Sequence, residues 1–122
     1  MSPQDLRRRV YELVMRVPPG KVTTYSAIAR TLGVHPRAVA VALKLNALPL
    51  LIPCHRVVRS DGSLGGYSFG GPQVKRWLLE AEGVRFDSRG RVLKDHILYD
   101  LPSIDKNLYV ANRDSLRQGG YT

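Results

Sequence analysis

The stretch that decides the expected fold is TYSAIARTLGVHPRAVAVALKL, residues 24–45. Thr24 can cap a short helix over residues 25–32, and Gly33 suits the position just after a helix end. A proline then opens a second helix over residues 36–45. Two short helices joined by a few residues that include glycine, in a strongly basic chain, predict a helix-turn-helix.

The second of these helices has an unusual composition for a DNA reader. It carries no Asn, Gln, Asp or Glu, the side chains that do much of the direct base reading in the major groove. Its alanines would let it approach a surface closely. We therefore expect any DNA binding to be sequence-tolerant, through backbone contacts and groove shape. The alternative interpretation is a buried helix with an Ala-rich packing face.

Helical patterns also flank this stretch on both sides. Ser2 and Pro3 are typical of a helix start, and the apolar stripe of that helix is Leu6, Val10, Leu13, Val14 and Val17. A further helix is expected from Pro72 until Gly83, with an apolar face of Val74, Trp77, Leu78 and Ala81. Residues 84–93 are typical of a short hairpin. The sequence therefore predicts a mainly α domain with a small β-hairpin, in a winged-helix-like arrangement.

The charge of the chain indicates a polyanionic partner. Its 122 residues are enough for one domain, and 19 Lys and Arg against 10 Asp and Glu give a formal net charge of +9. Such an excess favours nucleic acid over a membrane surface, because no basic amphipathic anchor is evident. The alternative is a basic protein whose charge serves solubility alone.

The cysteine and histidine content excludes several kinds of site. A single cysteine rules out an internal disulfide and a cysteine-based zinc site, and the three histidines show no metal-ligand spacing. We therefore expect no metal site. The sequence shows no signal peptide and no apolar run long enough to cross a bilayer, so we expect a cytoplasmic, nucleoid-associated protein.

The reactive chemistry is expected in LLIPCHRVV, residues 50–58, which contains the only cysteine. A thiol reacts as its thiolate, which nearby imidazole and guanidinium groups such as those of His55 and Arg56 can stabilise. The plain alternative is that Cys54 is a small buried hydrophobe. Glu80 and Glu82 would close a helix where the dipole disfavours negative charge, so we expect a glutamate held there to have a cationic or imidazole partner.

Taken together, these residues resemble the C-terminal domain of the alkylguanine-DNA alkyltransferases, also called methylated-DNA–protein-cysteine methyltransferases. The run Pro53-Cys54-His55-Arg56-Val57 is similar to that family's active-site motif, and the agreement extends from Lys21 to Gly83. Further positions that match the family are Tyr25, Arg37, Asn46, Gly65, Tyr67, Ser68 and Glu82.

The resemblance implies a single-turnover DNA repair reaction that needs neither a metal nor an organic cofactor. The protein would bind double-stranded DNA as a monomer, rotate a 6-O-alkylguanine out of the stack and transfer its alkyl group to Cys54. The catalytic residues implied are Cys54, His55, Glu82, Tyr25 and Asn46. The implied DNA contacts are Arg37, Tyr25, Thr24, Ala38, Lys44 and Arg56. The implied lesion pocket consists of Val57, Tyr67, Ser68, Gly65 and Phe69.

The resemblance also leaves an alternative open. Alkyltransferase-like proteins bind such lesions without repairing them and carry another residue, usually tryptophan, where this chain has Cys54. A chain of this kind would recruit other repair factors, and its protein partner could bind the extension over residues 94–122 that follows the expected domain at 1–93. With about twenty residues before the helix-turn-helix, we expect the family's N-terminal domain to be absent. A helix-turn-helix regulator and a cysteine protease are weaker alternatives.

Overall fold

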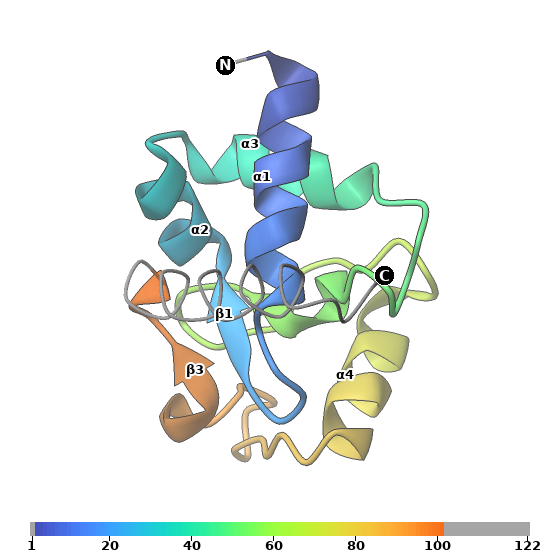
Figure 1. Ribbon diagram of the computed structural model, residues 1–122. Coiled ribbons are helices and arrows are strands. Elements are labelled where there is room, and N and C mark those ends of the chain that lie inside the picture. The colour runs from blue at the N-terminus through green and yellow to red at the C-terminus, as the bar shows by residue number, and fades with distance from the viewer. Residues whose placement is uncertain (1, 102–122) are drawn as a thin grey trace, which may run out of the picture.

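The computed structural model describes residues 2–101 and is mostly helical, as the sequence predicts (Figure 1). Its α-helices are α1 (Pro3–Met15), α2 (Tyr25–Leu32), α3 (Pro36–Lys44) and α4 (Gly71–Ala81). The strands are β1 (Val22–Thr24), β2 (Val57–Val58) and β3 (Ile97–Leu98). Two 3-10 turns complete these elements, η1 (Cys54–Arg56) and η2 (Lys94–His96). No helix within residues 2–101 is long and apolar enough to cross a membrane.

The helix-turn-helix expected from the sequence is confirmed, and local capping explains where its helices begin and end. The hydroxyl of Thr24 accepts a hydrogen bond from the main-chain N–H of Ala27 at 3.0 Å, which starts α2. Gly33 ends α2 in the left-handed region, with φ of 69°. Helix α3 starts at a proline and packs against both α2 and α1.

A three-stranded parallel sheet lies at the centre of the domain, and the sequence did not predict it. The strand order is β2-β1-β3, with Thr23 aligned on Val57 of β2 and on Leu98 of β3. Strands of two or three residues are too short to show an alternating pattern in the sequence. Because β1 runs directly into α2 and β2 follows η1, the sheet fixes the start of α2 next to the turn that carries Cys54.

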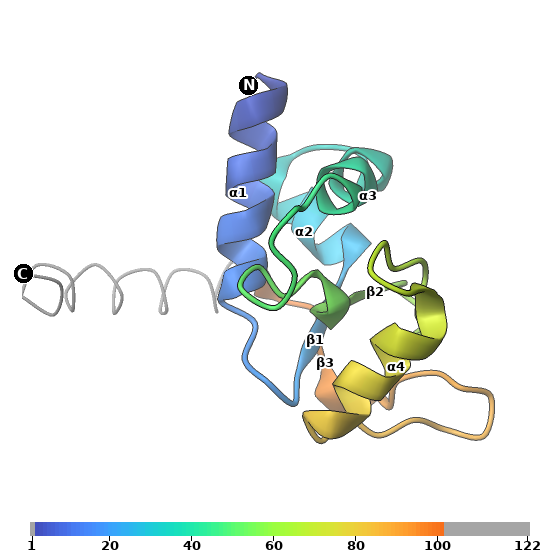
Figure 2. The ribbon, with the colours of Figure 1, turned by 90° about the vertical axis from the view of Figure 1, so that its right-hand side faces the viewer.

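The sheet separates two clusters of buried apolar side chains. The larger cluster, with Ile28, Val39 and Val57, lies among α1, α2 and α3. The smaller one, with Val58 and Leu79, lies between the sheet and α4. Consecutive strand residues point to opposite faces, so Val57 and Val58 enter different clusters. Figure 2 shows the same order, with α1, α2 and α3 on one side of the strands and α4 on the other.

The expected hairpin is present, but it is short. Phe86 and Val92 form an antiparallel bridge, and the main-chain N–H of Asp87 donates to the carbonyl of Arg91 at 2.8 Å. The chain then continues through η2 into β3, so residues 97–98, near the start of the predicted extension, contribute to the central sheet. The rest of the predicted C-terminal extension, from residue 102, lies outside the described residues.

The predicted apolar face of α4 is wrong. Trp77 is 71% exposed, whereas the buried side chains of this helix are Lys75 and Leu79. Leu79 packs into the smaller cluster, and Lys75 is buried because main-chain carbonyls accept hydrogen bonds from its ammonium group. An apolar pattern alone cannot identify a face on which a lysine replaces an apolar residue.

Candidate functional site

Cys54 opens the turn η1 and borders a cavity of about 420 Å³. Its residue surface is 7% exposed, so the thiol is shielded but reachable from the cavity. The remaining lining residues come from three segments that are far apart in the sequence: Tyr25, Ala40, Leu43, Lys44, Gly66, Tyr67 and Ser68. The thiol can therefore react only with a group that enters this cavity.

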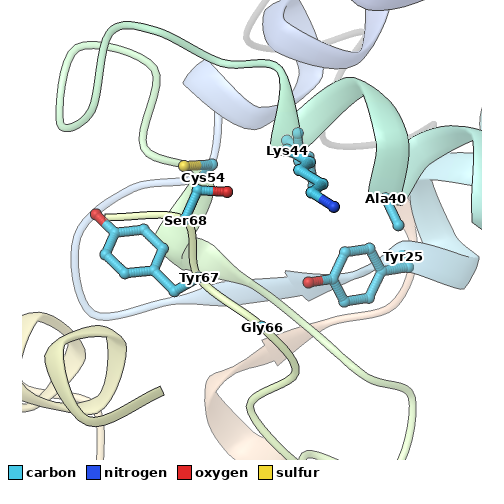
Figure 3. A pocket seen from close by; sticks show the side chains of 8 residues that line it. Tyr25, Ala40, Lys44, Cys54, Gly66, Tyr67 and Ser68 are labelled. Carbon is cyan, nitrogen blue, oxygen red and sulfur yellow. The ribbon is translucent and has the colours of Figure 1, made fainter. Parts of the chain in front are cut away.

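Each wall of this cavity comes from a different element (Figure 3). Helix α3 covers one side through Ala40, Leu43 and Lys44, and the loop after β2 forms the opposite side. Tyr25, the first residue of α2, lies across the cavity from Tyr67, and its hydroxyl points into the space between them. The cavity therefore lies directly beneath the second helix of the helix-turn-helix.

The residue after Cys54 is joined to a carboxylate. Nε2 of His55 lies 3.1 Å from Oε2 of Glu82. Burial lowers the pKa of His55, and Glu82 partly opposes this effect. Nδ1 of His55 is buried and makes no hydrogen bond within residues 2–101. With Nε2–H donated to Glu82, the neutral imidazole keeps Nδ1 as a proton acceptor.

Arg56 holds the same carboxylate. Its Nε donates to Oε1 of Glu82 at 3.0 Å, its Nη2 donates to Oε2 at 2.6 Å, and its Nη1 donates to the carbonyl of Val17 at 2.8 Å. Burial raises the pKa of Glu82, but the hydrogen bonds from Arg56 and His55 outweigh it and leave that pKa below its ordinary value. The expected partner of Glu82 is thus confirmed, and Glu82 is ionised at neutral pH.

Asn46 braces the segment that leads to Cys54. Its Nδ2 donates to the carbonyl of Ile52 at 3.0 Å, and its Oδ1 accepts from the main-chain N–H of Leu48 at 2.9 Å. The segment between them needs this support, because Leu50 has φ of 73°, in the region that favours glycine. The buried amide of Asn46 therefore fixes the path of the chain into the reactive turn.

The structure brings only some of the predicted DNA contacts to one surface. Arg37 and Lys44 are exposed on α3, with Ala38 half-buried between them. Thr24 is buried and its hydroxyl caps α2, and the guanidinium of Arg56 is occupied by Glu82 and Val17. The side chains of Thr24 and Arg56 are therefore structural supports rather than parts of the α3 surface.

Only some of the residues predicted for the lesion pocket line the cavity. Tyr67 and Ser68 line the cavity, whereas Val57 is fully buried in β2. The Phe69 ring packs edge-on against Tyr67, with ring centroids 5.6 Å apart. Gly65 lies against Tyr25, since a Cβ at this glycine would be 3.2 Å from the Tyr25 hydroxyl oxygen.

Sequence reasoning missed one polar residue beside the cavity, Lys75. Its Nζ lies 3.4 Å from the hydroxyl oxygen of Tyr25. One sequence signal could have pointed to it. Lys75 lies four residues before Leu79, and residues at this spacing share one face of a helix. Within residues 2–101, no group of three or more His, Cys, Asp or Glu side chains is arranged to hold a metal ion.

Comparison with solved structures finds a similar fold in two proteins whose names or bound DNA refer to O6-substituted guanine. S. pombe Atl1, solved in complex with damaged DNA containing O6-carboxymethylguanine, is 31% identical with a TM-score of 0.69, covering 80% of this chain and 98% of Atl1. The O6-methylguanine-DNA methyltransferase of Pyrococcus kodakaraensis is 47% identical with a TM-score of 0.59, over 64% of this chain and 46% of that protein.

Curated relatives agree with the structural comparison. The methylated-DNA–protein-cysteine methyltransferase of Methanothermobacter thermautotrophicus is 48% identical over 85 residues, which are 70% of this chain and 48% of the relative. The corresponding protein of Saccharolobus solfataricus is 53% identical over 79 residues, 65% of this chain and 51% of the relative. The chain thus spans about half the length of these relatives. Residues 5–84 match the family described as 6-O-methylguanine DNA methyltransferase, DNA binding domain, and the chain belongs to this family.

Proposed function

We propose that this protein repairs double-stranded DNA by taking the alkyl group of a 6-O-alkylguanine onto Cys54, once per molecule. The observation that carries this proposal is the Cys54 thiol facing a shielded cavity while the adjacent His55 is paired with Glu82. The relatives named methylated-DNA–protein-cysteine methyltransferases, which are 48% and 53% identical to this chain over the matched residues, support the same reaction.

DNA binding would use the exposed face of α3. Arg37 and Lys44 supply positive charge at the two ends of this helix, and Ala40 between them allows close approach to the groove. Because the cavity lies beneath α3, the damaged nucleotide must leave the base stack to reach Cys54. Rotating a base out of the stack costs roughly a few kcal/mol of free energy, and this cost is lower for a weakly paired damaged base. By resemblance to the family, Arg37 fills the gap that the nucleotide leaves.

Activation of the thiol would fall to His55 and Glu82. The Cys54 thiol gives its proton, through a water molecule, to Nδ1 of His55, which is the free acceptor of the neutral ring. The ionised Glu82 stabilises the imidazolium that forms, and Arg56 keeps that carboxylate ionised and in place. The thiolate then attacks the alkyl carbon in line, so that the S–C bond forms while the C–O6 bond breaks.

The leaving guanine needs a proton, and Tyr25, whose hydroxyl points into the cavity, would give it. Burial raises the pKa of Tyr25, so its phenol keeps its proton at neutral pH. His55 gains one proton and Tyr25 loses one, and exchange with solvent restores both. The displacement changes no oxidation state, so the reaction requires no oxidant or reductant. The product is a thioether on Cys54, which is too stable to be cleaved by the acids and bases around it, and the protein is consumed.

Recognition of the base would combine the loop and the turn. Ser68 and Tyr67 reach the cavity with their side chains, whereas Val57, whose side chain is buried, can contribute only its main chain. Cys54 lines the same cavity, and by resemblance to the family its main chain would also contact the base. Hydrogen bonds from these groups to the edge of the guanine would select the base without restricting the alkyl group.

The second candidate is a lesion binder that does not transfer the alkyl group and recruits other factors. The observation that favours it is the match to Atl1, which the chain covers over 98% of its length. Cys54 favours transfer, because a binder has no use for a nucleophile beside a histidine–carboxylate pair.

Mass spectrometry of the intact protein separates the two candidates. After incubation with a duplex containing one 6-O-methylguanine, we expect a one-methyl mass gain on Cys54, and no gain with the matched undamaged duplex. Cys54→Ser should abolish the gain while binding to the damaged duplex persists. Tight binding by the wild type without any mass gain would reject transfer and leave the lesion binder.

A further inference from the structure

Lys75 is fully buried in the middle of α4, with 0% of its surface exposed. Its ammonium group has three acceptors within reach. It donates to the carbonyl of Leu64 at 2.5 Å, to the carbonyl of Gly66 at 3.2 Å and to the hydroxyl oxygen of Tyr25 at 3.4 Å. The three N–H groups of the ammonium are therefore all used.

These hydrogen bonds connect α4 to two parts of the cavity wall. Gly66 lines the cavity on the loop side, and Tyr25 lines it at the start of α2. Between them, Gly65 has φ of 72° and approaches the Tyr25 hydroxyl so closely that a Cβ there would lie 3.2 Å from it. The ammonium also lies 5.7 Å from the centre of the Tyr25 ring. Lys75 thus links α4, the 64–66 loop and α2 at one point.

The hydrogen bond to Tyr25 determines what the phenol can do. Because the ammonium can only donate, the Tyr25 oxygen must accept, and its own hydrogen has to point in another direction. Figure 3 shows the hydroxyl of Tyr25 directed into the cavity. A phenol held in this way presents its proton to whatever base occupies the cavity.

A buried ammonium is costly compared with an apolar side chain of the same length. Burial lowers the pKa of Lys75 to about 8, against an ordinary value of 10.5, with the neighbouring Arg59 adding to the effect and Cys54 opposing it. A methionine could fill the same space without this cost. Charged groups whose pKa values are strongly shifted by burial occur more often at functional sites than elsewhere in a fold.

We propose that Lys75 is a positioning residue for alkyl transfer, because its ammonium group fixes the Tyr25 hydroxyl and the Leu64–Gly66 wall so that the Tyr25 proton faces the bound guanine. This inference rests on the proposed function, since it concerns the leaving-group side of that reaction. It differs from a purely structural role in one respect: the effect of Lys75 on the transfer rate must pass through Tyr25.

The test is a double-mutant cycle in single-turnover transfer from a 6-O-methylguanine duplex. We expect Lys75→Met to lower the saturating transfer rate about tenfold or more, as for one lost transition-state hydrogen bond, with little change in affinity for the duplex. Tyr25→Phe should lower the rate as well, and adding Lys75→Met to Tyr25→Phe should cause no further loss. Lys94→Met, which removes an exposed lysine from η2, is the matched control and should transfer at the wild-type rate.

Two results would overturn the proposal. Losses that multiply in the double variant would show that Lys75 acts independently of Tyr25. An equal loss in the reaction of Cys54 with iodoacetamide, which needs no proton for a leaving guanine, would place the effect of Lys75 on the thiol instead. If Lys75→Met does not fold, Lys75→Gln removes the charge while keeping an amide donor for the loop carbonyls, and the same cycle applies.

Hydrogen exchange separates failure of this inference from failure of the proposed function. A wild type that never gains a methyl group would reject the proposed function. In that case, faster amide exchange over residues 64–68 in Lys75→Met than in wild type would still support the link between Lys75 and the cavity wall. Unchanged exchange there would reject that link, whether or not the wild type transfers.

Discussion

Nε2 of His55 lies 3.1 Å from Oε2 of Glu82, and this contact ties the turn that carries the nucleophile to the C-cap residue that follows α4. The same carboxylate accepts two hydrogen bonds from Arg56, so the two residues that follow Cys54 share one anchor. A carboxylate at a helix C-terminus is unfavourable by itself, because it faces the negative end of the dipole. Its position there is explained by the two side chains that it holds.

Replacing Glu82 by glutamine should slow alkyl transfer by about a hundredfold. The amide has a similar shape but no charge, so it cannot stabilise the imidazolium that forms when His55 takes the thiol proton. Rapid-quench measurement of methyl transfer at saturating protein tests this expectation. Glu80→Gln is the matched control, because Glu80 is exposed on the same helix and contacts only Arg76 among the ion pairs of residues 2–101. A wild-type rate in Glu82→Gln would contradict the proton relay.

The stability of the protein in acid should also depend on Glu82. Its pKa is below the ordinary value, despite burial, because Arg56 and His55 bind the ionised form. Between the folded and unfolded pKa values the unfolded chain binds more protons, so the free energy of unfolding falls as the pH falls through this range. At neutral pH, Glu82→Gln should lower that free energy by about 2 kcal/mol. Urea unfolding at a series of pH values should show that the two proteins become equally stable at the acid end. A stability difference that stays constant with pH would show that the ionised Glu82 is not its cause.

Arg37→Ala should reduce methyl transfer more than it reduces initial binding to DNA. Arg37 is exposed at the first turn of α3, where it can enter the duplex beside the cavity, whereas association depends on the charge of the whole surface. Fluorescence of a 2-aminopurine placed next to the lesion would report flipping, and a filter-binding assay would report association. Arg89→Ala, in the hairpin turn, removes the same charge from another exposed place and controls for net charge. Equal losses in flipping and association would reject an intercalating role.

How far the sequence predicts this molecule differs from element to element. The helix-turn-helix was predictable because Thr24 and Gly33 act locally, through a hydroxyl cap and a left-handed backbone. The partner of Glu82 was also predictable in kind, because a helix end disfavours a carboxylate. The parallel sheet was not predictable, since Val57 and Val58 form an entire strand and their pairing depends on segments far away in the chain.

The site shows the same division between local and tertiary causes. Motif resemblance pointed to Tyr25 and Ser68, which the structure places around one cavity with Cys54. It could not show that the guanidinium of Arg56 turns inward to Glu82, nor that Trp77 is exposed while Lys75 is buried. Those outcomes depend on which main-chain carbonyls and carboxylates lie nearby after folding, and a sequence pattern contains no such information.

Asn46→Ala should loosen the turn that presents the thiol. The change removes the hydrogen bonds to the carbonyl of Ile52 and from the N–H of Leu48, and leaves the segment around Leu50 in its strained backbone without a brace. We expect a loss of about 2 kcal/mol in the free energy of unfolding, together with a slower reaction of Cys54 with iodoacetamide. Asn46→Asp keeps the acceptor for the N–H of Leu48, so its stability should lie between those of the wild type and Asn46→Ala. Wild-type stability in Asn46→Ala would show that the turn is held by other contacts.

The burial of Lys75 predicts that the protein becomes more stable as the pH rises above 8. Its pKa in the folded protein is about 8, well below the ordinary 10.5, chiefly because burial disfavours the ammonium form. Between these values the unfolded chain binds more protons than the folded one, so the free energy of unfolding rises with pH by up to about 1.4 kcal/mol per pH unit. The measurement is urea unfolding of Cys54→Ser, a variant without the thiol, between pH 7 and 9.5, roughly the window below tyrosine ionisation. The rise should disappear when Lys75→Met is added, and a rise of equal size in both proteins would show that another group causes it.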